Sequence, residues 1–202
     1  MTNPLTALTL LLICLMGFSH SGYAQVPYVV AEDQDVDIRL LGTSTVHDWE
    51  MKATSVTGRA EFIFAPGNIQ ELTALPSLTF SLAVTDLRSE SKGMDNNAYD
   101  ALRADEFEQI DYLLYSATVS SETGGFLLKT KGKLTIAGTT RDVLMDVHLS
   151  VDQEGTVTCR GAYDLKMTDY GVKPPTFLMG VMKCGDDLTL EFSVDYRNSA
   201  GA

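Results

Sequence analysis

The chain has 202 residues, 45% of them hydrophobic, and a formal net charge of −12. A surface this acidic argues against nucleic acid and against anionic membrane faces as electrostatic partners. The length and composition are those of one domain with a substantial hydrophobic core.

The N-terminal segment has the features of a targeting sequence. Residues 1–24 contain no Lys, Arg, Asp or Glu, and Leu5–Phe18 is almost continuously apolar. Gly22 and Ala24 are small residues at the −3 and −1 positions of a cleavage site. The pattern predicts a secretory signal peptide over residues 1–24 and export from the cytoplasm. The apolar run is too short for a comfortable membrane span, so we expect no stable insertion.

Five runs with strand-like patterns occupy the first part of the remaining chain; the first four alternate apolar and polar residues, and the fifth is apolar on both faces. Alternation with period two is typical of strands that have one face in water. Pro66 and Gly67 end the third run with turn residues. The predicted strands are Val36–Leu40, Val46–Ala53, Val56–Phe64, Leu78–Val84 and Ile110–Ser116.

One segment between these strands has a different pattern. Residues 95–107 lack β-branched side chains, and Ala98, Ala101 and Leu102 recur at helical spacing. This predicts a short helix over Asn97–Ala104. A helix of this length is not stable alone, so we expect it to lie across one end of the sheet.

The clearest alternation comes later, in Phe126–Ile136 and Val143–Val151. Ala137–Arg141 separates the two runs and contains a glycine, so they are predicted to form a hairpin. Thr156–Leu165 and Leu188–Tyr196 are two further predicted strands. Eight or nine short strands predict an all-β sandwich or barrel. An apolar sheet face must be covered, so we expect the function on the inside surface.

The sulfur-containing side chains allow two interpretations. Cys159 and Cys184 are predicted to form a disulfide if the protein is exported to an oxidising compartment. The alternative is a pair of thiols for metal or redox chemistry, but no Cys-x-x-Cys is present. Met167, Met179 and Met182 suggest soft-metal binding, although Met more often fills gaps in an apolar lining. No metal or cofactor is therefore predicted.

His47, Asp48 and Trp49 form the most conspicuous polar cluster. Neighbours in a strand point to opposite faces, so His47 and Asp48 are poorly placed to act as a dyad. His47 and Trp49 would share a face, either as a polar hook beside a stacking wall or as a buried Trp with a hydrogen-bonded His. No nucleophile motif accompanies them, although the members of a catalytic triad can also come together across a fold. A hydrolase using His47 and Asp48 is the weaker alternative.

The segment Met167–Met182 contains two prolines and two glycines, which disfavour regular structure. Tyr170, Val172 and Phe177 are nevertheless apolar, which a surface loop does not require. If tied by the predicted disulfide, the segment could cover an opening and complete an apolar chamber. Alternatively, its side chains only plug the core, and the sequence does not decide between these two hypotheses.

Several segments resemble the YceI family of polyisoprenoid-binding periplasmic proteins. Gly132–Val143 (GKLTIAGTTRDV) is similar to the family's Gly-x-Leu-Thr-Ile-x-Gly-x-Thr-Lys/Arg-x-Val segment. Val56–Phe62, Phe107–Tyr112 and Met167–Val172 resemble further family segments, and the resemblance covers roughly Val36–Tyr196. It implies a barrel similar to that of lipocalins, with a helix at one end and an apolar lumen that holds an isoprenoid chain. The resemblance also implies a periplasmic lipid-binding protein rather than an enzyme.

The sequence and the resemblance together predict an all-β fold over residues 25–202, an antiparallel eight-stranded lipocalin-like barrel with one short helix. Its lumen is predicted to hold a polyisoprenoid or isoprenoid-quinone-like lipid, because burial of each CH₂ contributes about 0.8 kcal/mol. A barrel filled by its own side chains, serving as an interaction module, is the other possibility. The predicted lipid-contacting residues are Leu78, Phe80, Leu82, Ile110, Tyr112, Phe126, Leu128, Leu134, Ile136, Val143, Met145, Leu190 and Phe192.

Overall fold

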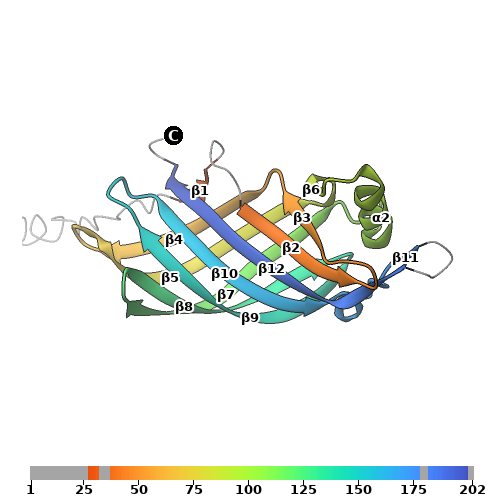
Figure 1. Cartoon of the computed structure of the whole chain (residues 1–202). Helices are drawn as coiled ribbons and strands as arrows, with labels where there is room; N and C mark the ends of the chain where they lie inside the picture. Colours follow the sequence, from red (N-terminus) through yellow and green to blue (C-terminus); the bar gives the residue numbers. More distant parts are fainter. Residues whose placement is uncertain (1–26, 32–36, 178–181, 200–202) are drawn as a thin grey trace, which may run out of the picture.

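The computed structural model describes residues 27–31, 37–177 and 182–199, so the predicted signal peptide lies outside the described residues. Strands dominate this part of the chain (Figure 1). The elements are β1 (Tyr28–Val30), β2 (Asp37–Ser44), β3 (Trp49–Ala53), β4 (Thr57–Ala65), β5 (Asn68–Ala83), the 3₁₀ turn η1 (Val84–Asp86), β6 (Leu87–Arg88), α2 (Lys92–Leu102), β7 (Gln109–Glu122), β8 (Gly125–Ile136), β9 (Thr139–Val151), β10 (Val157–Lys166), the 3₁₀ turn η2 (Met167–Tyr170), β11 (Thr176–Phe177) and β12 (Met182–Asn198).

The strands close into a barrel, which confirms the predicted fold class. β4, β5, β7, β8, β9, β10 and β12 pair in that order, and β1 pairs with both β12 and β4 to complete an antiparallel ring of eight strands. β12 also pairs with β2, from which β3 and β6 extend the sheet. Closure gives each strand of the ring a partner on both sides. It also turns one face of the sheet, the apolar one, toward the inside of the barrel.

The predicted hairpin of Phe126–Ile136 and Val143–Val151 is present as β8 and β9. Their pairing is regular from Phe126 opposite Leu149 to Ile136 opposite Thr139. The turn is shorter than expected, because Ala137 (φ 47°) and Gly138 (φ 76°) make it alone. Two positive φ angles are typical of the two-residue turn that matches the twist of paired strands, so β9 begins at Thr139.

Several other strand predictions had wrong boundaries, and β5 and β3 show the reasons most clearly. β5 begins at Asn68, ten residues before Leu78, and its register with β4 shifts repeatedly over this extension. This extension was missed because it contains Pro76, and proline is uncommon inside a sheet. β3 begins at Trp49 rather than Val46, because Ser44 and His47 close a turn through the hydrogen bond from Ser44 N to His47 O (3.0 Å).

The helix α2 begins five residues before the predicted start. Ser91 caps it, its hydroxyl accepting a hydrogen bond from Met94 N (3.4 Å). The last helical residue is Leu102, two residues before the predicted end at Ala104. Arg103 (φ 53°) follows it in the left-handed conformation and ends the helix. As predicted, α2 lies at one end of the barrel (Figure 1). No helix in the described part of the chain is long and apolar enough to cross a membrane.

β1 and β4 lie toward the end of the barrel away from α2 (Figure 1), and aromatic side chains from β1, β4 and β12 pack together in the core. The Phe62 ring lies edge-on to Tyr28, with ring centroids 5.2 Å apart, and edge-on to Tyr196 at 5.7 Å. Phe64 packs beside Tyr28 and Phe62. Edge-to-face aromatic contacts of this kind stabilise a core beyond their buried area.

The predicted disulfide between Cys159 and Cys184 is wrong. Cys159 in β10 pairs with Val194 of β12, and Cys184 lies ten residues before Val194 on that strand. At about 3.3 Å per residue, the two cysteines are about 30 Å apart along the barrel. A disulfide requires Cα atoms within about 7 Å. Both cysteines are free thiols.

Candidate functional site: an apolar lumen

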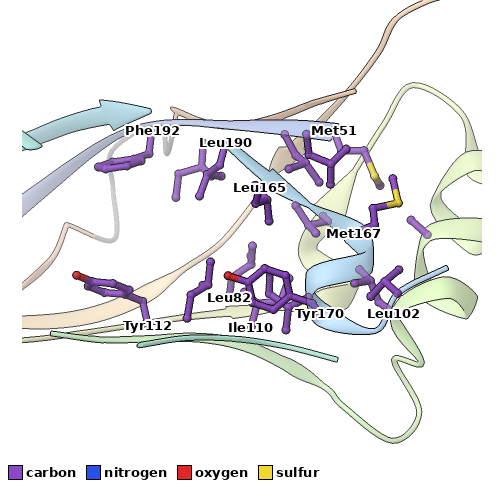
Figure 2. A pocket seen from close by; sticks show the side chains of 18 of the residues that line it. Met51, Leu82, Leu102, Ile110, Tyr112, Leu165, Met167, Tyr170, Leu190 and Phe192 are labelled. Carbon is purple, nitrogen blue, oxygen red and sulfur yellow. The ribbon is translucent and has the colours of Figure 1, made fainter. Parts of the chain in front are cut away.

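The barrel encloses a cavity of about 680 Å³ (Figure 2). Its walls come from β2, β3, β5, β7, β8, β9, β10 and β12, with α2 and η2 at one end. The predicted residues that line it are Leu78, Phe80, Leu82, Ile110, Tyr112, Leu128, Leu134, Ile136, Met145, Leu190 and Phe192. The barrel is therefore hollow, which the sequence alone did not decide.

Strand register explains why residues so distant in sequence meet in the lumen. Phe80 pairs with Tyr112, and Tyr112 pairs in turn with Leu134 on the next strand. Directly opposed residues of an antiparallel pair share one face of the sheet. In the same way, Leu82 pairs with Ile110, so the alternation that identified each strand places these rows of side chains inward.

Phe126 and Val143 are the two predicted contacts that do not line the cavity. Both are buried, and their strands have the expected alternation. Phe126 pairs with Leu149 and belongs to the large core cluster. Val143 lies opposite Gly132, in a second cluster with Tyr170 and other residues near η2. Their side chains contribute to packing rather than to the wall of the cavity.

The cavity opens at the end where α2 lies. The exposed residues among its lining are His47, Ser91 and Gly93, from the turn between β2 and β3 and from the start of α2. We call this opening the mouth. Met94 and Leu102 present the apolar face of α2 to it, together with Ala98 and Ala101. The sequence indicated that face, although its residues were not predicted to contact a ligand.

The segment after β10 completes the chamber, as one of the two hypotheses for Met167–Met182 proposed. Met167, Tyr170 and Val172 are buried and line the cavity, and Figure 2 shows Met167 and Tyr170 projecting from η2 into it. Residues 178–181 lie outside the described part of the chain. Hydrogen bonds rather than a disulfide hold η2 in place.

Two side chains supply these hydrogen bonds. Arg141 Nε donates to the Asp169 backbone carbonyl (2.7 Å). Asp186 accepts from both the backbone N–H (2.9 Å) and the hydroxyl (2.6 Å) of Thr168. The Thr168 contacts hold the pKa of the Asp186 carboxyl below its usual value, so the Asp186 side chain is charged at neutral pH.

His47, the candidate for catalysis, lies exposed in the turn at the mouth. Its Nδ1 is 2.7 Å from the backbone carbonyl oxygen of Asp48. The Asp48 side chain does not line the cavity, whereas His47 and Trp49 do, as their predicted common face requires. Trp49 is half-buried and donates from Nε1 to the Thr43 carbonyl (3.0 Å). As predicted, the side chains of His47 and Asp48 therefore do not lie together on one face.

Several lining residues were absent from the predicted set. Leu40 and Leu165 lie in predicted strands and follow the same alternation, so that signal could have found them. Met51 lies beside Trp49 in the predicted face of β3, and Met167 comes from a segment with no regular pattern. None of the described residues lining the cavity is Asp, Glu, Lys or Arg.

Comparison with known proteins identifies the family. The YceI-like domain family matches residues 33–196. No match is found among curated proteins.

Solved structures show the same fold. BcnA of Burkholderia cenocepacia is 18% identical, with a TM-score of 0.59, covering 80% of this chain and 99% of that one. A polyisoprenoid binding domain from Saccharophagus degradans, implicated in plant cell wall breakdown, is 10% identical with a TM-score of 0.65, covering 86% and 99%. The Campylobacter jejuni YCEI protein is 19% identical with a TM-score of 0.52, covering 70% and 81%. At these identities the likeness establishes the fold. Together with the family match over most of its length, the hollow eight-stranded barrel shows that this chain belongs to the YceI-like domain family.

Proposed function

We propose that this protein is an extracytoplasmic binding protein that holds an isoprenoid-type lipid along the barrel lumen. The observation that carries the proposal is the apolar cavity of about 680 Å³, which opens at the α2 end. Its volume lies within the range of small-molecule sites. Each buried CH₂ contributes about 0.8 kcal/mol, so an apolar chain can bind without any ion pair.

Two further observations support the ligand class and the location. The structurally similar domain from Saccharophagus degradans is named as polyisoprenoid-binding, and the same kind of ligand suits a long lumen lined by aliphatic and aromatic side chains. The composition of residues 1–24 favours export, because an uncharged apolar segment followed by small residues is typical of a secretory signal.

The geometry favours binding over catalysis. A catalytic His needs a third group to orient it and a nucleophile within hydrogen-bonding reach. His47 Nδ1 is engaged by a backbone carbonyl instead. The nearby Ser44 hydroxyl donates to the His47 backbone carbonyl (2.8 Å), not to the ring. The polar groups at the mouth therefore stabilise the turn between β2 and β3.

The experiment compares two tryptophan substitutions at adjacent positions of β9. Met145 lines the cavity, whereas the neighbouring Leu144 is 72% exposed on the outer face. The full chain would be expressed in a bacterial host and purified without detergent, and copurifying lipid would be extracted and measured by mass spectrometry. We expect wild type and Leu144→Trp to carry the same lipid, and Met145→Trp to carry several-fold less.

Leu190→Trp, from β12, provides a second narrowing variant if Met145→Trp folds poorly, because Leu190 also points into the lumen (Figure 2). Circular dichroism would confirm that the compared variants are folded. Equal lipid content in all four proteins would place the lipid outside the barrel. Wild-type protein that contains no lipid and takes up no isoprenoid from vesicles would refute the binding function.

A further inference from the structure

Tyrosines apart, most of the polar side chains that line the cavity belong to its mouth. Ser44 and His47 come from the turn between β2 and β3, Ser91 is the N-terminal cap of α2, and Asn97 lies within that helix. The rest of the described lining is mainly aliphatic and aromatic. The cavity therefore has one polar end and an apolar interior, and a ligand that matches it has a polar head and an apolar tail.

Asn97 places an amide on the apolar face of α2. It lies three residues after Met94 and four before Ala101, a spacing that puts side chains on one face of a helix. All three residues line the cavity, whereas the neighbouring Asn96 is exposed and does not. A polar side chain on the inward face of an amphipathic helix departs from the usual pattern, so a hydrogen-bonding partner is expected for it.

The other side chains at the mouth already hydrogen-bond within the protein. Ser44 and His47 each contact a backbone carbonyl of their own turn, and the Ser91 hydroxyl accepts from the backbone of α2. The Asn97 amide has no hydrogen-bond partner in the described part of the chain. It is half-buried, and neither its oxygen nor its nitrogen is among the fully buried unpaired atoms. A group inside the cavity can therefore reach it.

The chemistry of this amide restricts the head of the ligand. A carboxamide offers one acceptor oxygen and two N–H donors, so it suits a group that both donates and accepts, such as a hydroxyl or an amide. A phosphate or carboxylate only accepts hydrogen bonds, and no Lys or Arg is among the described lining residues to pair with its charge. Placing an unpaired charge against apolar walls costs more than placing a neutral group there.

From these observations we propose that Asn97 recognises the head of the bound lipid, and that this head is an uncharged hydroxyl or amide group. The head binds at the mouth against the Asn97 amide, and the apolar tail extends along the lumen away from α2. This inference rests on the proposed lipid-binding function and deepens it, because it names the head chemistry and the direction of the ligand. A net hydrogen bond corresponds to about a fivefold change in affinity.

Two probes of equal chain length, hexadecanol and hexadecane, test the contact with the head. Their binding to delipidated full-length protein would be measured by competition with a fluorescent lipid. Asn97→Leu removes the amide at nearly constant size, and leucine is the better helix former, so α2 should stay folded. We expect Asn97→Leu to lower the affinity for hexadecanol relative to hexadecane about fivefold.

Asn96→Leu is the matched control, because it makes the same change at the adjacent exposed position of α2, outside the cavity lining. We expect it to leave the ratio of the two affinities unchanged. An unchanged ratio in Asn97→Leu, or an equal fall in both variants, would overturn the inference. A wild-type protein that binds neither probe would also refute the proposed lipid-binding function.

A change of charge at the same position tests whether the head lies beside it. Asn97→Asp keeps the shape of the side chain and adds a carboxylate, whereas hexadecylamine carries a positive head at neutral pH. We expect Asn97→Asp to bind hexadecylamine about threefold more tightly than wild type does. Asn96→Asp adds the same charge outside the lining and should change this affinity much less. Equal effects of the two substitutions would show only a general attraction and would overturn the inference.

The direction of the ligand can be read from Trp49, which lies at the mouth and is the only Trp in the chain. Hexadecanol brominated beside its hydroxyl should quench Trp49 fluorescence more than hexadecanol brominated at its terminal carbon, because the head lies at the mouth and the tail end lies deep in the lumen. The reverse order would mean that the tail points toward α2 and would overturn the inference, while leaving the proposed lipid-binding function intact.

Discussion

The Trp49 indole lies over Gly42 on the neighbouring strand, where a Cβ would come within 2.1 Å of the ring. Gly42 thus creates the space that holds the indole at the mouth of the cavity. We expect Gly42→Ala to displace the ring and to lower the free energy of unfolding by about 1–3 kcal/mol, since overpacking costs this much. Urea denaturation would measure the loss, and the Trp49 emission maximum would report the altered environment.

Gly93 provides the control for this substitution. It also lines the mouth, but a Cβ there would lie 3.7 Å from the Ser91 hydroxyl, in ordinary contact. Gly93 is within α2, so Gly93→Ala should raise stability by about 0.5–1 kcal/mol. Equal destabilisation by the two substitutions would contradict the role assigned to Gly42.

A buried carboxylate fastens α2 to the strand before it. Asp95 is 4% exposed and accepts hydrogen bonds from the Ser89 backbone N–H and hydroxyl, both at 2.7 Å. Asp95→Ala leaves this backbone donor unpaired, and we expect it to cost about 1.5–3 kcal/mol of unfolding free energy. Asp100→Ala, at an exposed position of the same helix, should change stability by less than about 0.5 kcal/mol. Similar urea midpoints for the two variants would refute the anchoring role of Asp95.

The fold and the inner face of the barrel could be predicted because both follow from a local pattern. Leu78, Phe80 and Leu82 alternate with polar residues, and closure of the sheet turns that whole face inward. Phe126 and Val143 follow the same alternation without reaching the cavity. Alternation decides which face a side chain occupies, but its depth along the barrel depends on register and on neighbours.

Other features depend on contacts between segments far apart in the sequence. The separation of Cys159 from Cys184 follows from the pairing of β10 with β12, which the spacing of two cysteines cannot show. The position of the Tyr112 ring likewise depends on Gly132 in the adjacent strand, over which the ring packs. The early start of α2 was missed because its first two residues are Lys92 and Gly93, and glycine is a poor helix former.

Alkaline pH should destabilise the protein, because buried Cys and Tyr side chains resist ionisation in the folded state. Burial and the neighbouring Asp195 raise the pKa of Cys159 from 9.0 to about 12, and burial chiefly raises that of Tyr170 from 10.0 to about 12. Above pH 9 the unfolded chain loses protons that the folded state retains, so the stability present below that pH is lost as pH rises toward 12. For Cys159 the expected loss is about 1.4 kcal/mol per pH unit. Urea unfolding between about pH 8 and pH 11 should therefore give a steeper decline for wild type than for Cys159→Ala. Parallel declines would show that the thiol ionises equally in both states.

The two thiols should also differ in reactivity, because they differ in burial although both line the cavity. Cys159 is buried with its pKa raised to about 12, whereas Cys184 is half-buried beside the opening and has a smaller pKa rise caused by burial. The thiolate is the reactive form, so near pH 8 we expect Ellman's reagent to modify Cys184 slowly and Cys159 only after unfolding. Protein that begins at Gln25 would be used, so that Cys14 does not contribute to the thiol count. Cys184→Ala should then abolish the slow phase in the native state.

A long-chain alcohol bound in the lumen should slow the reaction of Cys184 further, since Cys184 lines the cavity. Absence of free thiols in urea without reductant would mean that the cysteines are oxidised, in conflict with the separation imposed by the pairing of β10 with β12.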